Sequence, residues 1–221
     1  MKTFIDVCCN ECWHSPEKPC DQFVRCCTEG PLCHHNPGCE KKFKDLNRKL
    51  KYEEHDVPII IIGKGTCGLA AGAQKVEDAI RAELSKLNIK AQIETTGCVG
   101  CCAQEPIVDI KMPGGDRISY SQVSPKIVPR LIKKTIVEKD IFKENLLGTY
   151  GKSNGEVKNI NKTPFFEHQM KVVLENCGVV NPTSIDAYIS NGGFKALDKV
   201  ICHMKPEEVV KDVLASGLRG R

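Results

Sequence analysis

Hydrophobic and polar positions follow two different patterns between residues 57 and 138, one typical of strands and one typical of a helix. Val57–Ile62 is a continuous apolar run, and Ala91–Thr95 is a second run with the length of a strand. Between them, residues 68–87 carry apolar side chains at intervals of three and four, which is the period of an amphipathic helix. This stretch therefore predicts a strand, a single helix and a second strand.

Two more strand-like runs follow, Ile107–Lys111 and Arg117–Tyr120, with turn residues at Pro113–Asp116 between them. They predict a β-hairpin. Ser124 and Pro125 then provide the start signals of a last helix, whose apolar residues share one face. The resulting order, β-α-β-β-β-α, is that of a thioredoxin-like domain and predicts an α/β fold.

The changing pattern divides the chain into four parts. We expect a Cys/His-rich metal-binding segment over 1–45, the α/β domain over 56–139, a polar linker over 140–166 and a helical part over 167–221. Capping residues and glycines in this last part predict four helices, over 168–178, 181–193, 194–202 and 205–217.

Composition narrows the class of protein. The chain has 221 residues and a net charge of +4, without a basic stripe interleaved with aromatic residues, which disfavours a nucleic-acid binder. No apolar run has transmembrane length and no signal-peptide core is present, so the predicted location is the cytoplasm. Because cytosolic thiols stay reduced, the fourteen cysteines favour metal or iron–sulfur ligation over disulfides.

The loop after the first predicted strand contains Gly63, Gly65 and Gly68 in the spacing G-x-G-x-x-G, which is typical of dinucleotide-binding turns. A doubly wound nucleotide-binding sheet would not continue with a hairpin, so we disfavour this interpretation. The same loop carries Cys67, and the loop after the second strand carries Cys98 and Cys102. Both loops leave the same edge of the predicted sheet, so the three thiols can converge on a metal centre.

The stretches "GTCGLAAGA", "TTGCVGCCAQEPIVDI" and "YSQVSPKIVPRLIKK" resemble the thioredoxin-like [2Fe–2S] ferredoxin domain of NADH-oxidising complexes. The resemblance implies cluster ligands in the pattern C-x4-C and C-x3-C, of which Cys67, Cys98 and Cys102 are present. Ile62 stands at the first ligand position. Three interpretations stay open: Cys101 or an N-terminal cysteine is the fourth ligand, the cluster is incomplete, or the domain is a cluster-free scaffold.

The stretches "VLENCGVVNPTSIDAYISNGGFKAL" and "MKPEEVVKDVLASGLRGR" resemble the start of the complex I flavoprotein subunit and its relatives in electron-bifurcating hydrogenases, formate dehydrogenases and transhydrogenases. In that family, Gly220 and Arg221 would open the loop that contacts FMN and NAD(P)H. The rest of that site is missing, so the chain is expected to be a fragment or to be completed by another chain. The resemblance implies other oxidoreductase subunits as partners.

The N-terminal segment holds eight of the cysteines, between Cys8 and Cys39. Cys9 and Cys12 have the two-residue gap of a metal knuckle. A tetrahedral site could be completed by Cys26 or Cys27, Cys33, His34 and Cys39, and the spacing does not select among them. We expect a structural zinc with Cys9, Cys12, Cys27 and Cys33 as the first choice of ligands, and a [4Fe–4S] cluster as the alternative.

Two functions from different classes follow. The first is an electron-transfer subunit of a soluble NAD(P)H-dependent, flavin-based electron-bifurcating oxidoreductase. The alternative is a cluster-free assembly module that docks partner subunits and carries a structural zinc. A thioredoxin-type exchange pair of Cys98 and Cys101 is disfavoured, because this C-x-x-C follows a strand instead of opening a helix.

Overall fold

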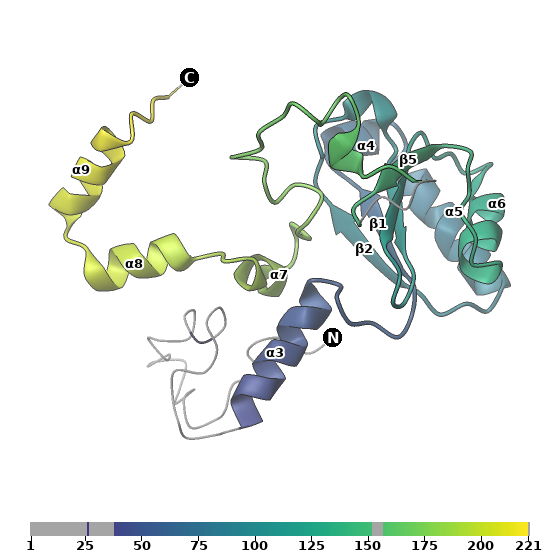
Figure 1. Cartoon of the computed structure of the whole chain (residues 1–221), viewed down its shortest axis with the longest axis horizontal. Helices are drawn as coiled ribbons and strands as arrows, with labels where there is room; N and C mark the ends of the chain where they lie inside the picture. The colour runs from purple at the N-terminus through teal and green to yellow at the C-terminus, as the bar shows by residue number, and fades with distance from the viewer. Residues whose placement is uncertain (1–25, 27–37, 152–156, 221) are drawn as a thin grey trace. The chain divides into compact units, whose positions relative to one another are not determined.

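A computed structural model describes residue 26 and residues 38–151 and 157–220. These residues fall into two compact units, which are considered separately (Figure 1). Unit 2 is formed by Tyr52–Ser184, and unit 1 combines the N-terminal residues up to Lys51 with Ile185–Arg221. Within the described residues, no helix is both long and apolar enough to cross a membrane.

Unit 2 is built on one five-stranded sheet with the order β2-β1-β3-β4-β5. The edge strand β2 pairs with β1 in parallel, and the remaining pairs are antiparallel. The predicted order of elements and the predicted hairpin between β3 and β4 are confirmed. The strands are β1 (Ile59–Gly63), β2 (Gln92–Thr96), β3 (Val108–Lys111), β4 (Arg117–Tyr120) and β5 (Leu146–Thr149).

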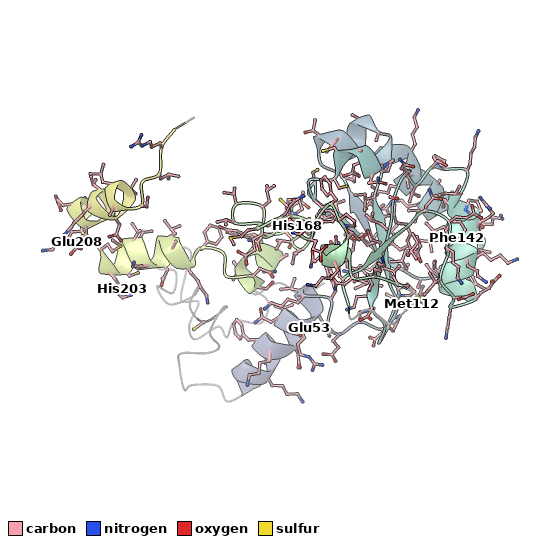
Figure 2. The ribbon with its side chains drawn as sticks, turned by 45° about the horizontal axis from the view of Figure 1, so that its top comes forward. Glu53, Met112, Phe142, His168, His203 and Glu208 are labelled. Carbon is pink, nitrogen blue, oxygen red and sulfur yellow. The ribbon has the colours of Figure 1, made fainter. Side chains whose placement is uncertain are left out.

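One face of the sheet is covered by α5 (Ala73–Lys86) and by α6 (Val128–Ile132), which continues as a π-helical turn, Lys133–Val137 (Figure 1). Alternate strand residues point to this side because successive side chains of a strand face opposite ways. Met112, at the end of the hairpin, packs against this apolar core, and Phe142 belongs to it (Figure 2). The fully buried members of this apolar core include Ile60, Ile62, Val76, Ile80, Val108, Leu131 and Ile132.

The opposite face of the sheet is partly polar. Tyr52 packs with Ile59 and Ile61 on this side. Asp109 and Arg117 form a buried ion pair across the hairpin, with the Nε of Arg117 donating to Asp109 over 2.8 Å. The guanidinium of Arg117 stacks 4.4 Å from the ring centre of Tyr150. Burial raises the pKa of Tyr150, and the negative charge of the nearby Asp109 raises it further, so the phenol stays neutral.

The predicted helix over 68–87 is broken in two. A short helix, α4 (Thr66–Ala70), ends before Gly72, which adopts a left-handed φ of 101° and precedes α5. The break removes Leu69 from the apolar stripe and leaves its side chain 48% exposed. The helical period correctly predicted helical structure over this stretch, but the prediction of a single helix is wrong, because Gly72 turns the chain between α4 and α5.

The linker expected over 140–166 contains a strand, β5, which pairs with β4 (Figure 1). Only two leucines precede a glycine here, so the local pattern lacks the alternation that marks a strand. β5 exists because β4 offers a free edge. The helix expected over 168–178 is wrong: this segment forms turns, and residues up to Asn181 pack against the loops and edge of the sheet.

Unit 1 is helical in its described residues. Phe43, Leu46 and Leu50 are buried on one face of α3 (Gly38–Leu50), which contacts α7 (Ile185–Ser190). The last two helices are α8 (Lys195–His203) and α9 (Pro206–Ala215), which agree with the predicted helices. Neither has a buried residue.

Candidate metal centre

Three thiols converge at the carboxyl ends of β1 and β2, as the sequence predicts. Cys67 lies in α4 directly after β1, Cys98 follows β2, and Cys102 opens the short 3-10 helix η1 (Cys102–Gln104). The Sγ atoms of Cys67 and Cys98 are 3.1 Å apart, and those of Cys98 and Cys102 are 3.6 Å apart. All three sulfurs lie within 4.8 Å of one another, close enough to bind one ion or cluster. We call Cys67, Cys98 and Cys102 the thiol group.

Glycines allow the two loops to approach each other. A Cβ at Gly65 would lie 3.0 Å from the Cβ and the backbone nitrogen of Cys98. A Cβ at Gly68 would lie 2.2 Å from the carbonyl oxygen of Gly63, which is too close for any side chain. The fingerprint-like glycines therefore have a structural explanation: they bring the start of α4 against β1 and Cys67 towards Cys98.

The thiol group also receives a backbone donor. The N–H of Gly100 points at the Sγ of Cys98 over 3.3 Å, and Gly100 has a left-handed φ of 95°. Such N–H groups stabilise negative charge on sulfur, as they do around iron–sulfur clusters. This contact fits a thiolate ligand at Cys98.

The pKa values of Cys67 and Cys98 are shifted in opposite directions. When Cys67 loses its proton, the thiols of Cys98 and Cys102 can donate to its sulfur, which lowers the pKa of Cys67. Burial, followed by the interaction with Cys67, raises the pKa of Cys98 to about 12. Cys67 is therefore expected to ionise before Cys98, and binding of a cation would favour ionisation of Cys98 as well.

Glu105 is a buried carboxyl group beside the thiol loops that sequence analysis missed. Its carboxylate accepts a hydrogen bond from the N–H of Ile107 over 2.8 Å and packs against the backbone at Gly63 and Gly68. Burial raises the pKa of Glu105, and the nearby Asp109 raises it further. The only signal in the sequence was its place between the cysteine loop and a buried strand.

The structure describes one candidate for the fourth ligand, Cys101, and also Ile62, which stands at the expected first ligand position. Cys101 is only 8% exposed and packs in an apolar cluster away from the thiol group. Ile62 is completely buried in the main core and offers no ligand atom. Among the described residues, the thiol group therefore provides three sulfur ligands, which fits three of the four positions of an iron–sulfur cluster or of zinc.

Other predicted site residues lie elsewhere or outside the described part of the chain. The four cysteines expected to bind zinc and Arg221 fall outside the described residues. Gly220 is exposed and follows α9. The four cysteines expected to bind zinc are Cys9, Cys12, Cys27 and Cys33.

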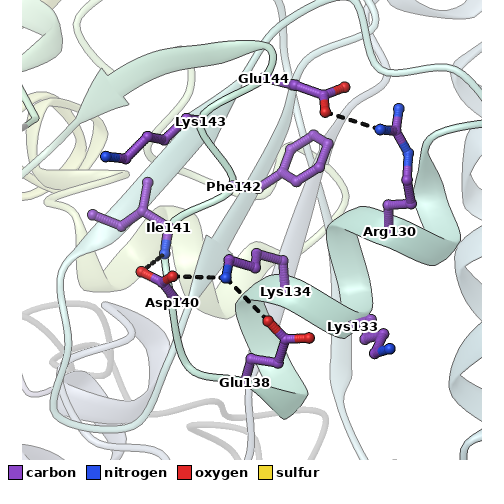
Figure 3. A pocket seen from close by; sticks show the side chains of 9 residues that line it. All are labelled: Arg130, Lys133, Lys134, Glu138, Asp140, Ile141, Phe142, Lys143 and Glu144. Atoms are coloured by element: carbon purple, nitrogen blue, oxygen red, sulfur yellow. Dashed lines mark hydrogen bonds and ion pairs between the residues drawn. The ribbon is translucent and has the colours of Figure 1, made fainter.

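A hollow beside α6 is a separate feature of unit 2 (Figure 3). Two of its cations pair with acids: Arg130 with Glu144 over 2.9 Å, and Lys134 with Asp140 over 2.8 Å. Lys134 also binds Glu138 over 3.0 Å. Because neighbouring acids already engage these two cations, the hollow is better explained as a surface ion-pair network than as an anion site.

Comparison with known proteins finds partial relatives. No protein-family model matches the chain. A stretch of 53 residues is 49% identical to the NADP-reducing hydrogenase subunit HndC of Solidesulfovibrio fructosivorans and covers 24% of this chain. A stretch of 105 residues is 25% identical to the subunit HndB of the same organism and covers 44% of this chain and 83% of HndB. The chain spans only 11% of the length of HndC.

Solved structures with similarity include a thioredoxin-like [2Fe–2S] ferredoxin from Aquifex aeolicus. It shares 19% sequence identity with a TM-score of 0.38, covering 46% of this chain and 98% of the ferredoxin. A second structure of the wild-type ferredoxin from this organism gives 18% identity and a TM-score of 0.36, covering 42% and 98%.

Proposed function

We propose that the chain is an electron-transfer subunit, or part of one, in which the thiol group holds a [2Fe–2S] cluster. The observation that carries this proposal is the convergence of three sulfurs within 4.8 Å on two adjacent loops. The names of both partial relatives, which are subunits of an NADP-reducing hydrogenase, support a redox role. A cluster bound there would supply one-electron transfer.

The residues of the chain have separate tasks in this proposal. Cys67, Cys98 and Cys102 would be the ligands, and the N–H of Gly100 would stabilise the charge on the Cys98 sulfur. Gly65 keeps the two ligand loops in contact. The protein positions and tunes the centre, whereas the electron chemistry belongs to the cofactor.

The proposal extends to the larger assembly. Other subunits of a hydrogenase, formate dehydrogenase or transhydrogenase would be the partners, and the complex would use FMN and NAD(P)H for flavin-based electron bifurcation. Gly220 and Arg221 would begin the FMN and NAD(P)H site, and Cys9, Cys12, Cys27 and Cys33 would hold a structural zinc. These parts rest on the resemblance of the sequence and on the names of the two partial relatives.

Anaerobic purification followed by iron and sulfide assays tests the cluster. We expect iron and acid-labile sulfide in equal amounts, and an EPR signal after reduction with dithionite. Cys98→Ser should abolish both. Cys101→Ser is the matched control, since Cys101 lies in the same loop but outside the thiol group, and it should retain them. Wild-type protein without iron would overturn the proposal.

The burial of Ile62 favours a second candidate, the cluster-free assembly module, because three thiols alone leave one cluster position unfilled. In that case, about one zinc and no iron should be found per chain. The Ile62→Cys variant separates the two functions. If a cluster forms only in this variant, the native loop keeps the fold without the centre. If the native chain already binds iron, the variant should only increase its retention in air.

A further inference from the structure

The thiol group has a second chemistry that needs no metal. Disulfide formation requires two sulfurs that can come within about 2.05 Å of each other. The sulfurs of Cys67 and Cys98 are already 3.1 Å apart, although 30 residues separate them in the chain. The remaining approach, about 1 Å, is within the reach of a side-chain rotation at the loops. The two cysteines lie in segments that follow the neighbouring parallel strands β1 and β2, so a bond between them would join two segments that already touch.

The third thiol makes this pair exchangeable. The Sγ of Cys102 is 3.6 Å from that of Cys98, so Cys98 has a potential disulfide partner on either loop. Cys102 is exposed, whereas Cys67 and Cys98 are partly covered. Exchange proceeds by attack of one sulfur on a disulfide, and its rate depends on access. Cys102 is therefore the thiol of this group that a small reagent in solution reaches most easily.

We infer that, in the metal-free chain, Cys67, Cys98 and Cys102 form a thiol–disulfide exchange site for low-molecular-weight disulfides. Its oxidised state is a Cys67–Cys98 disulfide, and Cys102 is the thiol through which this bond is made and reduced. Cys101, the partner in the pair that the sequence disfavours, takes no part, because the structure places it in an apolar cluster. The inference does not depend on the proposed function, since it concerns the chain before a cluster is bound.

The steps balance with glutathione disulfide as the oxidant. Cys102 attacks one glutathione sulfur, which releases the first glutathione and leaves a mixed disulfide on Cys102. Cys98 attacks the Cys102 sulfur and releases the second glutathione as its own proton is lost. Cys67 then attacks the Cys98 sulfur and regenerates free Cys102. In total, two protein thiols lose two electrons and two protons, and one glutathione disulfide becomes two glutathiones.

Peptide mapping on the complete 221-residue chain tests this inference. The chain is freed of metal with a chelator, reduced, exposed to glutathione disulfide and then alkylated. Trypsin places Cys67 in the peptide Gly65–Lys75 and the other loop cysteines in Ala91–Lys111. The expected product is a cross-link between these two peptides, lighter by two hydrogen atoms than their sum. It should disappear on reduction.

Three variants assign the roles. In Cys67→Ser the reaction should stop at a disulfide within Ala91–Lys111, between Cys98 and Cys102. In Cys102→Ser the cross-link should form at least about tenfold more slowly, because the accessible entry thiol is lost. Cys101→Ser, the control, should behave like the native chain. A native chain without the cross-link, or a cross-link that requires Cys101, would overturn the inference.

The result is distinguishable from that of the iron assay. A cross-link without iron binding would leave thiol exchange as the chemistry of the group. Iron binding without the cross-link would retain the metal centre and reject the exchange site. Both results together would mean that oxidation blocks loading, so the oxidised chain should take up no iron at this group until it is reduced.

Discussion

Cys101 and Cys102 are neighbours in the sequence, but their side chains belong to two regions of unit 2 with opposite chemistry. Cys102 joins the thiol group at the rim of the sheet. Cys101 is buried in an apolar cluster that we call the loop core, formed by Val99, Cys101, Ile107, Ile160 and Phe166. The turn at Gly100, with its left-handed φ of 95°, lies between Cys98 and this pair. One loop therefore supplies both a reactive surface and the packing that supports it.

The contrast between these two regions predicts that the loop core determines the stability of the fold and that the thiol group determines metal binding and thiol reactivity. Burial of apolar surface stabilises the fold roughly in proportion to area. A partly exposed thiol contributes little to that term, but it remains available as a ligand or nucleophile. Substitutions in the two regions should therefore separate stability from metal content.

The largest effect on stability is expected from Phe166→Ala. Phe166 is 5% exposed and packs in the loop core, so its truncation should lower the free energy of unfolding by about 3–5 kcal/mol. Phe165→Ala is the matched control, because Phe165 is the adjacent ring but is 50% exposed. Urea unfolding followed by circular dichroism measures both. Equal losses in the two variants would contradict the importance of the loop core.

The adjacent cysteines provide the next test. Cys101→Ser buries a hydroxyl group among apolar side chains and should cost about 1–3 kcal/mol, with iron content unchanged. Cys102→Ser changes an exposed residue and should stay within about 0.5 kcal/mol of the native stability, but it should lose the iron. If Cys101→Ser removed the iron, the division between the two regions would be wrong.

The sequence predicted a large part of this arrangement. The strand and helix periods identified β1, α5, the hairpin and the last helix of the sheet domain, and the loop positions correctly brought Cys67, Cys98 and Cys102 together. These features depend on local pattern and on the rule that parallel strands end at the same edge. The sequence identified Cys102 as a ligand but left Cys101 open as a fourth one, because the packing that buries Cys101 in the loop core has no local signal.

The features that the sequence missed depend on contacts between distant segments. β5 forms on the free edge of β4, and Asn181 donates to Glu94 of β2 over 2.6 Å across 87 positions. Neither contact leaves a periodic signal in its own segment. The turns over 168–178 have helix-like composition, but Gly178 packs where a Cβ would lie 2.6 Å from Val99. Packing against the cysteine loop thus outweighs local helix propensity.

A smaller effect, and one that depends on pH, is expected at Glu105. Because burial raises the pKa of Glu105, the native state holds its proton to higher pH than the unfolded chain does. The protonated form thus stabilises the fold at low pH, and this contribution is lost as pH rises through the raised pKa. Glu105→Gln should remove this loss, so its melting temperature should fall less than that of the native chain as pH rises above the ordinary carboxyl pKa of 4.5.

The control for this pH dependence is Glu144→Gln, a substitution of an exposed carboxylate in a surface ion pair. It should leave the pH profile of the native chain almost unchanged, because surface pairs contribute little. If the melting temperatures of the native chain and of Glu105→Gln changed in parallel above pH 4.5, the pKa of Glu105 would not be raised in the native state.

The smallest effect on stability should come from Lys171, which contacts both the cysteine loop and the loop core. Lys171 donates to the carbonyl oxygen of Val99 over 3.4 Å, and its Nζ lies 4.6 Å from the ring centre of Phe166. The hydrogen bond is long and the cation–π contact is worth about 0.5–1 kcal/mol, so Lys171→Met should lower the stability by about that amount. Lys162→Met, at an exposed position of η3 (Ile160–Lys162), should have no measurable effect. Urea unfolding of both variants, with iron content measured in parallel, tests whether Lys171 only supports packing. If Lys171→Met lost its iron, the contact of Lys171 with the carbonyl oxygen of Val99 would instead hold Cys98 in its ligand position.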